Sequence, residues 1–231
     1  LDEDLLVQEY KFSHDRVQQA AYALIDESHK QVVHLQIGCN LLEKTSAEQR
    51  SDRLFEIIDH LNQGLKLVTA RSERTEIARL NLMAGQKAKA ATAYEAAFKY
   101  FTTGLKLLNS ESWQGEYDLT LALYSEAAEA AYLQGCFDEM EQLVEVVLDR
   151  AKTVVDKVQA YDSRIQGYSS QGNLKETLKT GLEALKLLGI DLIENPSQAD
   201  IQRELESTAA LLAEREIEDL INLPELTAPE P

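Results

Sequence analysis

The sequence predicts an all-α protein in which antiparallel helical hairpins stack into a superhelix. Residues 1–195 contain no proline, and proline is the residue that helix interiors tolerate least. Ala, Leu, Glu, Gln and Lys dominate the composition, and these residues favour helices. Apolar residues also recur at intervals of three and four along nearly the whole chain, which is the spacing of an amphipathic helix.

The first part of the chain is expected to form a series of helices. The first has one apolar face, made of Val17, Ala20, Ala21, Leu24 and Ile25. The second covers about 29–42, and we expect these apolar residues to point inward: Val32, Val33, Leu35, Ile37 and Leu41. Further helices are expected over about 51–67 and about 73–91, where the same periodicity continues.

The second half of the chain contains an internal repeat, because the segments 92–108, 135–148 and 172–188 align with one another. Thr92, Gly135 and Gly172 then correspond, at spacings of 43 and 37 residues. An Ala-rich helix precedes each segment, with two sets of equivalent positions: Gly85, Ala128 and Ile165, and Ala88, Ala131 and Tyr168. Small residues let paired helices approach closely, and glycine suits a short turn. Each unit is therefore expected to be a hairpin that buries its apolar face only by stacking on its neighbours.

The spacing resembles that of the tetratricopeptide repeat (TPR), whose period is about 34 residues. The match is degenerate, since the small residue of the family's second helix is present as Ala97 but replaced by Met140 and Thr177. We predict about three TPR-like hairpins over 73–195, capping helices over 196–222 and an acidic, Pro-rich linker over 223–231. The last long helix is expected over 197–215, with Ser197 as its N-cap. Its inward residues would be Ile201, Leu205, Ala209 and Leu212.

Charge and cysteine content exclude several classes of function. The formal net charge of −17 argues against general binding to a phosphate backbone. Bases outnumber acids over 66–108, which makes this stretch either a docking surface for an acidic partner or an ordinary solvated face. Cys39 and Cys136 are too few and too far apart for a disulfide framework or a metal site, which favours a reducing cytoplasm. No signal peptide or membrane-spanning run is found, and we expect no membrane partner.

The sequence offers no catalytic constellation. The four histidines are His14, His29, His34 and His60. His29 and His34 are five residues apart and do not share a helix face, and no carboxylate falls at zinc-site spacing. Nucleophile motifs and a Gly-rich phosphate loop are missing as well. We therefore predict that this segment is not itself an enzyme and holds no metal or cofactor.

In TPR arrays the first helix of each repeat lines a concave groove. Transferring the groove-facing positions of the repeat onto this chain gives a polar set with mixed charges, suited to a peptide or a neighbouring domain. Taken singly, each member is better interpreted as ordinary polar surface. The set is Arg79, Gln86, Lys89, Ser125, Glu129, Tyr132, Gln159, Asp162, Gln166 and Ser169.

An ordered series of motifs extends through the chain: "YKFSHDRVQQAAYALI", "HKQVVHLQIGCNLL", "LFEIIDHLNQGLKLV" and "YEAAFKYFTTGLKLL". The series resembles the region that follows the ATPase core in bacterial STAND-type multi-sensor signalling kinases. Those proteins join a serine/threonine kinase domain, a P-loop ATPase, a helical-repeat region, a GAF domain and often a histidine kinase. The resemblance covers nearly the whole chain. LuxR-family ATPase transcriptional regulators share a looser form of the series, so the inducer-binding region of such a regulator is the alternative.

The kinase resemblance implies a place and a role for this chain. Residues 1–72 would be the end of a winged-helix or helical linker region behind an ATPase. The missing initiator Met and the Pro-rich end lead us to expect a piece of a longer polypeptide. The implied function is non-catalytic: the groove binds a protein or peptide and passes the signal to the flanking ATPase and kinase domains.

The same resemblance gives "FSHD" a function in the parent protein. His14 would contact the phosphates of bound ADP as a nucleotide sensor, with Asp15 as its partner and as the N-cap of the helix. ATP or ADP and Mg²⁺ would bind in the parent rather than in this segment. A histidine donor beside a helix N-terminus suits an anion, but Asp15 could equally serve only to cap the helix.

Overall fold

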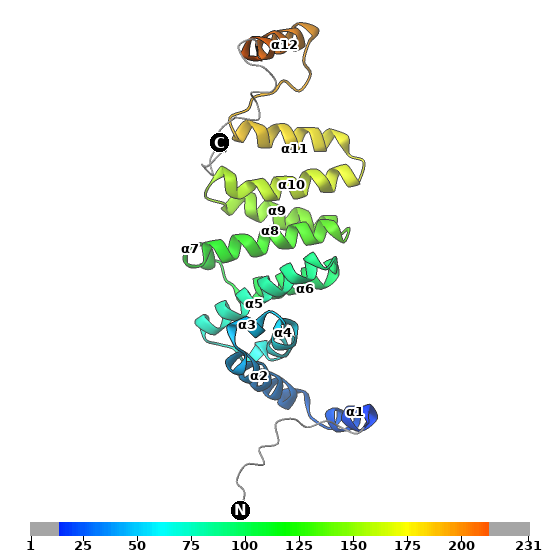
Figure 1. Ribbon diagram of the computed structural model, residues 1–231, viewed down its shortest axis with the longest axis vertical. Helices are drawn as coiled ribbons and strands as arrows, with labels where there is room; N and C mark the ends of the chain where they lie inside the picture. The colour runs from blue at the N-terminus through cyan, green and yellow to red at the C-terminus, as the bar shows by residue number, and fades with distance from the viewer. Residues whose placement is uncertain (1–13, 213–231) are drawn as a thin grey trace, which may run out of the picture.

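The computed structural model describes residues 14–212, and every regular element in that range is helical (Figure 1). The all-α class predicted from composition and periodicity is therefore confirmed. In chain order the elements are α1 (Asp15–Ala23), α2 (Glu27–Lys44), α3 (Ala47–Arg50), α4 (Leu54–Gln63), the 3₁₀ turn η1 (Leu65–Leu67), α5 (Arg71–Ala90), α6 (Tyr94–Leu107), α7 (Ser112–Gly115), α8 (Tyr117–Leu133), α9 (Phe137–Arg150), α10 (Val154–Ser170), α11 (Leu174–Leu187) and α12 (Gln198–Leu212).

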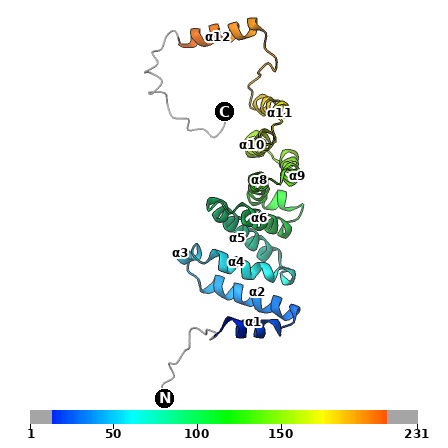
Figure 2. The same ribbon diagram turned by 90° about the vertical axis from the view of Figure 1, so that its right-hand side faces the viewer.

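Consecutive long helices pair as hairpins and stack in order along the long axis of the molecule. The pairs are α5 with α6, α8 with α9, and α10 with α11. Because α6 also packs on α8, and α10 packs on both α8 and α9, each hairpin rests on the next (Figure 1). In the side view α8 and α10 lie on one side of the stack and α9 on the other (Figure 2). We call α5, α8 and α10 the first helices.

The same turn joins the two helices of each pair. Its key residues are Thr92, Gly135 and Gly172, the positions that the repeat alignment made equivalent, and all three have positive φ, of 59°, 82° and 73°. In each turn the following N–H bonds back to the preceding helix, to the carbonyl oxygens of Ala88, Ala131 and Tyr168 at 2.8–2.9 Å. This is the Schellman pattern that ends a helix with a left-handed residue. The repeat alignment thus predicts the register of the turns correctly.

Small residues let the paired helices approach closely inside the core. A Cβ atom on Gly85 would lie 2.3 Å from Cε1 of the fully buried Phe101, so α5 and α6 meet at this point without room for a side chain. One buried cluster joins α4, α5, α6 and α8, and a second joins α8, α9 and α10. Burial of this apolar area is the main term that stabilises the stack.

The N-terminal helices differ from the prediction in two respects. In α2, Leu35 and Leu41 pack against the core as expected, but Val32, Val33 and Ile37 are 46, 40 and 36% exposed, so their predicted inward orientation is wrong. These residues are exposed because α2 lies near the end of the stack. It packs mainly on α4 and η1, so part of its apolar surface has no neighbouring helix. The helix expected over 51–67 is also shorter. It ends at Gln63 with Gly64 as its C-cap, and η1 follows.

At the other end, α12 begins as predicted but does not bury its apolar side. The Ser197 hydroxyl accepts the N–H of Asp200 at 3.3 Å, which confirms Ser197 as the N-cap. Ile201, Leu205 and Leu212, expected to face inward, are 49, 60 and 42% exposed, and Ala209 is exposed too. Figures 1 and 2 show α12 set apart from α11. Periodicity identifies an apolar face but not the element that covers it, so the capping function remains a prediction.

Candidate interaction surface

A set of polar contacts joins the first helices to one another. At its centre Lys89 on α5 pairs with two carboxylates of α8, at 2.5 Å from Nζ to Glu126 and 2.9 Å to Glu129. The Lys89 and Glu126 side chains are only 22 and 14% exposed. Burial alone would lower the pKa of Lys89, but the hydrogen bonds and charges of the two glutamates raise it above its ordinary value. Lys89 is therefore held as a cation between two helices.

Three more contacts extend this set along the same helices. Arg79 pairs with Glu116 at 2.7 Å, Gln86 donates to Glu126 at 3.1 Å, and Gln159 on α10 donates to Glu129 at 3.0 Å. Glu129 thus connects α5, α8 and α10. We call the set the inter-repeat ladder: Arg79, Gln86, Lys89, Glu116, Glu126, Glu129 and Gln159.

The ladder joins residues that are roughly one repeat apart in the sequence. Arg79 and Glu116 are 37 residues apart, and Gln86–Glu126 and Lys89–Glu129 are each 40 apart. Glu129 and Gln159 are 30 residues apart. These separations are shorter than the corresponding repeat spacings of 43 and 37 residues, so each contact joins adjacent first helices at positions offset by a few residues from the aligned register. Glu116 and Glu126 were missed by the sequence analysis. A search for complementary charges about one repeat apart would have found both.

The remaining predicted groove residues are not all part of this surface. Ser125 is only 3% exposed, so its predicted groove-facing position is wrong. The reason is that it lies next to Glu126 on α8, about 100° around the helix and turned toward the core. Tyr132 packs against the α8–α9–α10 cluster, and Asp162 lines a separate groove between α10 and α11. Gln166 and Ser169 are exposed on α10.

The basic stretch over 66–108 is largely used within the fold. Arg74 donates to the carbonyl oxygens of Lys106 and Leu107 at 3.0 and 3.1 Å. Lys87 donates to the carbonyl of Ser51 at 2.6 Å and lies over the ring of Phe55. Together with the ladder pairs, these contacts show that many of the bases join helices rather than form a free cationic patch.

At the N-terminal end of the described range, His14 is the N-cap of α1, but its side chain makes no capping bond. Asp15 is the first helical residue, so its predicted position as N-cap is wrong. The extended backbone of His14 (φ −143°, ψ 136°) places the start of the helix one residue earlier than the sequence suggests. Both side chains are exposed. The nucleotide-sensing function of this pair remains a prediction.

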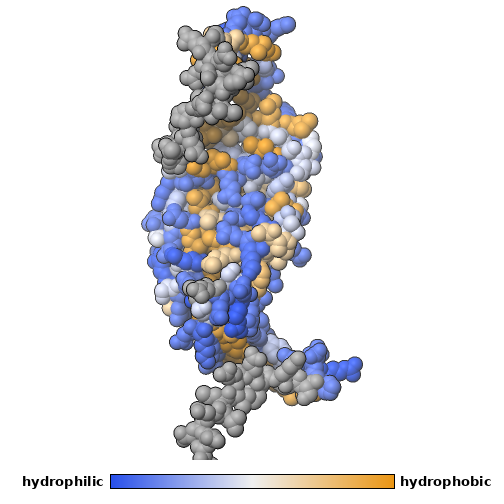
Figure 3. All heavy atoms as spheres, viewed as in Figure 1, coloured by the Kyte–Doolittle hydropathy of each residue, from blue (hydrophilic) through white to orange (hydrophobic). Residues whose placement is uncertain are grey.

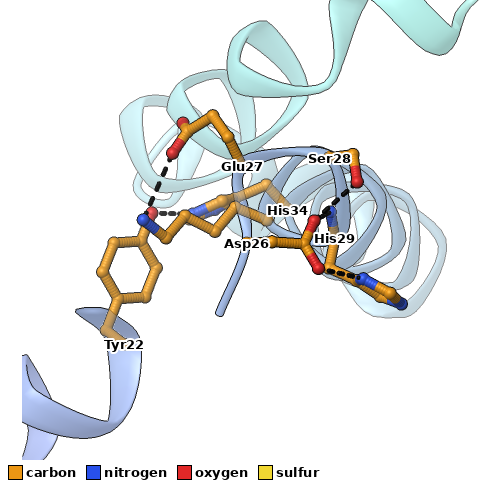
Figure 4. A network of polar contacts seen from close by, with 7 residues as sticks. Tyr22, Asp26, Glu27, Ser28, His29 and His34 are labelled. Carbon is orange, nitrogen blue, oxygen red and sulfur yellow. Dashed lines mark hydrogen bonds and ion pairs between the residues drawn. The ribbon is translucent and has the colours of Figure 1, made fainter. Parts of the chain in front are cut away.

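A polar network connects α1 with α2 (Figure 4), and it continues to His60 on α4. The Tyr22 hydroxyl lies 2.8 Å from Nε2 of His34, and Nδ1 of His34 lies 2.7 Å from Nδ1 of His60. On the same helix Asp26 is the N-cap and accepts from Ser28 and His29. These hydrogen bonds hold the pKa of Asp26 well below its ordinary value. The network ties α1 to the body of the protein through His34.

Within 14–212 no group of three or more His, Cys, Asp or Glu residues is arranged to hold a metal ion. No helix in that range has the length and hydropathy needed to cross a membrane.

Comparison with known proteins gives a match to a signal-transduction kinase. No family model matches the chain, and no solved structure matches it. Hybrid signal transduction histidine kinase G of Dictyostelium discoideum is 29% identical over 237 residues, which cover 92% of this chain but 7% of that kinase. The chain is thus similar, over most of its length, to a small part of a signal-transduction kinase. Because Dictyostelium is a eukaryote, the bacterial origin implied by the sequence resemblance remains a prediction.

Proposed function

We propose that this chain is a non-catalytic, TPR-like segment of a larger signalling kinase, in which it couples a protein signal to flanking ATPase and kinase domains. The observation that carries the proposal is the similarity to a histidine kinase over 92% of the chain. That similarity favours a kinase over the LuxR-family alternative. The proposed division places the TPR-like hairpins over 73–195 and the end of the linker over 1–72.

The contacts between first helices support a scaffold in which a movement of one hairpin displaces the next. Glu129 on α8 contacts both Lys89 on α5 and Gln159 on α10. A displacement of α10 would therefore be transmitted to α5 through these two polar contacts. Helical solenoids are stabilised by such nearest-neighbour interfaces and bind partners along an extended surface. Four predicted groove residues are exposed on α10: Gln159, Asp162, Gln166 and Ser169. Because Gln159 is bonded to Glu129 and Asp162 lines the groove between α10 and α11, we assign partner contact to Gln166 and Ser169.

The proposed nucleotide sensor belongs to the parent protein. His14 lies at the start of α1 with its side chain free of capping contacts, and in the parent it would donate to a phosphate of bound ADP, with Asp15 beside it. ATP or ADP and Mg²⁺ would be held by the ATPase domain. A His14→Ala substitution in the parent is expected to weaken ADP binding by about tenfold, since a charge-assisted hydrogen bond contributes about 1.4 kcal/mol or more.

The scaffold proposal is tested by calorimetry between this chain and the separately purified ATPase domain of its parent. The Gln166→Arg/Ser169→Arg variant is expected to abolish the heat of binding, because two long cations then occupy the contact surface. The Gln202→Arg/Ser207→Arg variant adds the same charge at exposed positions of α12 and is expected to bind normally. Equal binding by both variants, or robust ATP hydrolysis by the isolated chain, would overturn the proposal.

A further inference from the structure

A cavity of about 550 Å³ opens on the side of α8 away from the inter-repeat ladder. It lies between the end of α6, the α7 turn, α8 and α9. Tyr124 lines it and is two residues from the ladder residue Glu126, so the two side chains project about 200° apart around α8. The cavity is therefore a separate site from the surface that the proposed function uses.

Aromatic rings form one wall of this cavity. Trp113 stacks on Tyr124, with ring centroids 5.4 Å apart and an interplanar angle of 27°. Leu105 and Leu108 at the end of α6 add apolar surface. Burial raises the pKa of the Tyr124 phenol, so the ring carries no charge at neutral pH. A flat, half-buried aromatic wall of this kind attracts planar or cationic groups.

Carboxylates form the opposite rim. Glu145 and Asp149 are four residues apart on α9 and so lie on one face of that helix. Both side chains are 72% exposed. Arg150 also lines the cavity but is paired with Asp149 at 2.9 Å, and Glu145 lies 3.6 Å from Arg164. Asp138, seven residues before Glu145, lies on the same face of α9 outside the cavity, whereas Glu141 is paired with Arg164 at 2.6 Å.

We propose that this cavity binds an arginine side chain from a basic segment of a partner protein. The planar guanidinium stacks on the Trp113–Tyr124 wall, and its N–H groups donate to Glu145 and Asp149. Arginine suits both surfaces, because its cation is weakly hydrated, stacks on aromatic rings and binds carboxylates through two parallel hydrogen bonds.

The proposal has a direct optical test, because Trp113 is the single tryptophan of the sequence. Tryptophan fluorescence is titrated with the capped peptide Ala-Arg-Arg-Ala at about 0.15 M salt, where non-specific surface attraction is screened. We expect a saturable change in emission. The same peptide with lysine in place of arginine is expected to bind at least about fivefold more weakly. The lysine ammonium is not planar, so it cannot stack on the rings or form bidentate hydrogen bonds with a carboxylate.

Two charge-matched variants locate the site. Glu145→Gln/Asp149→Asn is expected to weaken binding at least about tenfold, as loss of a hydrogen-bonded charge pair predicts. Asp138→Asn/Glu139→Gln removes the same charge from the same helix outside the cavity and is expected to leave binding within about twofold. Circular dichroism checks that both variants are folded. The proposal is overturned by equal losses in both variants, by equal binding of the lysine peptide, by a preference for Ala-Glu-Glu-Ala, or by no saturable change.

Discussion

At the scale of single residues, the contact between His34 and His60 sets a clear electrostatic constraint. Their Nδ1 atoms are 2.7 Å apart, so one ring must donate and the other must accept. If the Tyr22 hydroxyl donates to Nε2 of His34, then His34 donates its Nδ1 proton to a neutral His60. Two imidazolium rings cannot share this geometry, because neither has an acceptor nitrogen.

This constraint predicts a dependence of stability on pH. Burial, and then the charge of His60, lowers the pKa of His34 below its ordinary 6.5, with Glu27 acting in the opposite direction. Glu56 on α4, which is paired with Arg53, also faces His60, and Lys30 on α2 lies over the Tyr22 ring. Because the unfolded chain binds a proton at His34 more readily than the folded chain, stability falls as the pH drops below about 6.5.

Thermal unfolding at about pH 7.5 and about pH 5.5 measures this effect. The wild-type Tm is expected to fall over this interval, and the fall is expected to be smaller in His34→Asn. His14→Asn, which removes an exposed histidine without capping bonds, is the matched control and should retain the wild-type fall. An identical fall in all three proteins would contradict the prediction.

Close packing at Gly85 gives a second prediction at this scale. A Gly85→Ala substitution places Cβ 2.3 Å from the ring of Phe101, which is fully buried and cannot move aside. We expect a loss of about 2–3 kcal/mol in the free energy of unfolding by urea. Gly181→Ala on α11 meets nothing within 4 Å and should instead stabilise by about 0.5–1 kcal/mol. A neutral Gly85→Ala variant would show that α5 and α6 pack less closely.

At the scale of the helices, the repeated turn contains one residue that does not suit its conformation. Thr92 has φ 59°, whereas its two equivalents are glycines. A left-handed backbone costs a side chain with a Cβ about 1–2 kcal/mol, and β-branching makes it less favourable still. The position is exposed, so nothing packs against the threonine to offset this cost.

Thr92→Gly is therefore expected to stabilise the protein by about 1 kcal/mol, measured as an increase in the urea midpoint at constant slope. The converse substitution, Gly135→Thr, should destabilise it by a similar amount. If Thr92→Gly lowers the midpoint, the positive φ at this turn is not a property of the folded protein.

The turns also show how far the sequence predicts this fold. Glycine at two of three aligned positions was enough to place Thr92 in the same turn, because the local conformation follows from the residues themselves. Orientation of the terminal helices was not predictable in this way. The apolar stripe of α12, with Leu205 60% exposed, has the same periodicity as a buried helix, and periodicity carries no information on what covers it.

The residues of the candidate surface were only partly predictable from the sequence. Transfer of the TPR groove positions found Lys89, Glu129 and Gln159, which do meet across the first helices. It failed at Ser125 because a neighbouring position on α8 faces the core. It missed Glu116 and Glu126 because partners in a ladder come from adjacent repeats, and only a comparison across repeats reveals them.

At the scale of the whole molecule, the inter-repeat ladder links successive hairpins through polar contacts between α5, α8 and α10. Lys89→Met leaves two glutamates of α8 side by side, with Glu126 only 14% exposed and without its cation. We expect a loss of about 2 kcal/mol in the free energy of unfolding, because an uncompensated, partly buried charge is costly. Arg203→Met, which breaks an exposed pair with Asp200, should change stability by less than about 0.5 kcal/mol.

On the face in Figure 3, hydrophilic residues are interspersed with hydrophobic ones along the stack. Such a mixed surface is compatible with contacts to other domains of one polypeptide. The chain aligns with 7% of the kinase that it resembles. The proposed coupling function implies that the α10 surface around Gln166 and Ser169 controls a catalytic activity located elsewhere in the parent protein.

Autophosphorylation of the full-length parent, followed with radiolabelled ATP, tests that claim most directly. Gln166→Arg/Ser169→Arg is expected to change the rate at least about fivefold, about 1 kcal/mol in coupling free energy, whereas Gln202→Arg/Ser207→Arg is expected to leave it unchanged. An unchanged rate in the first variant, with both proteins folded, would contradict the claim.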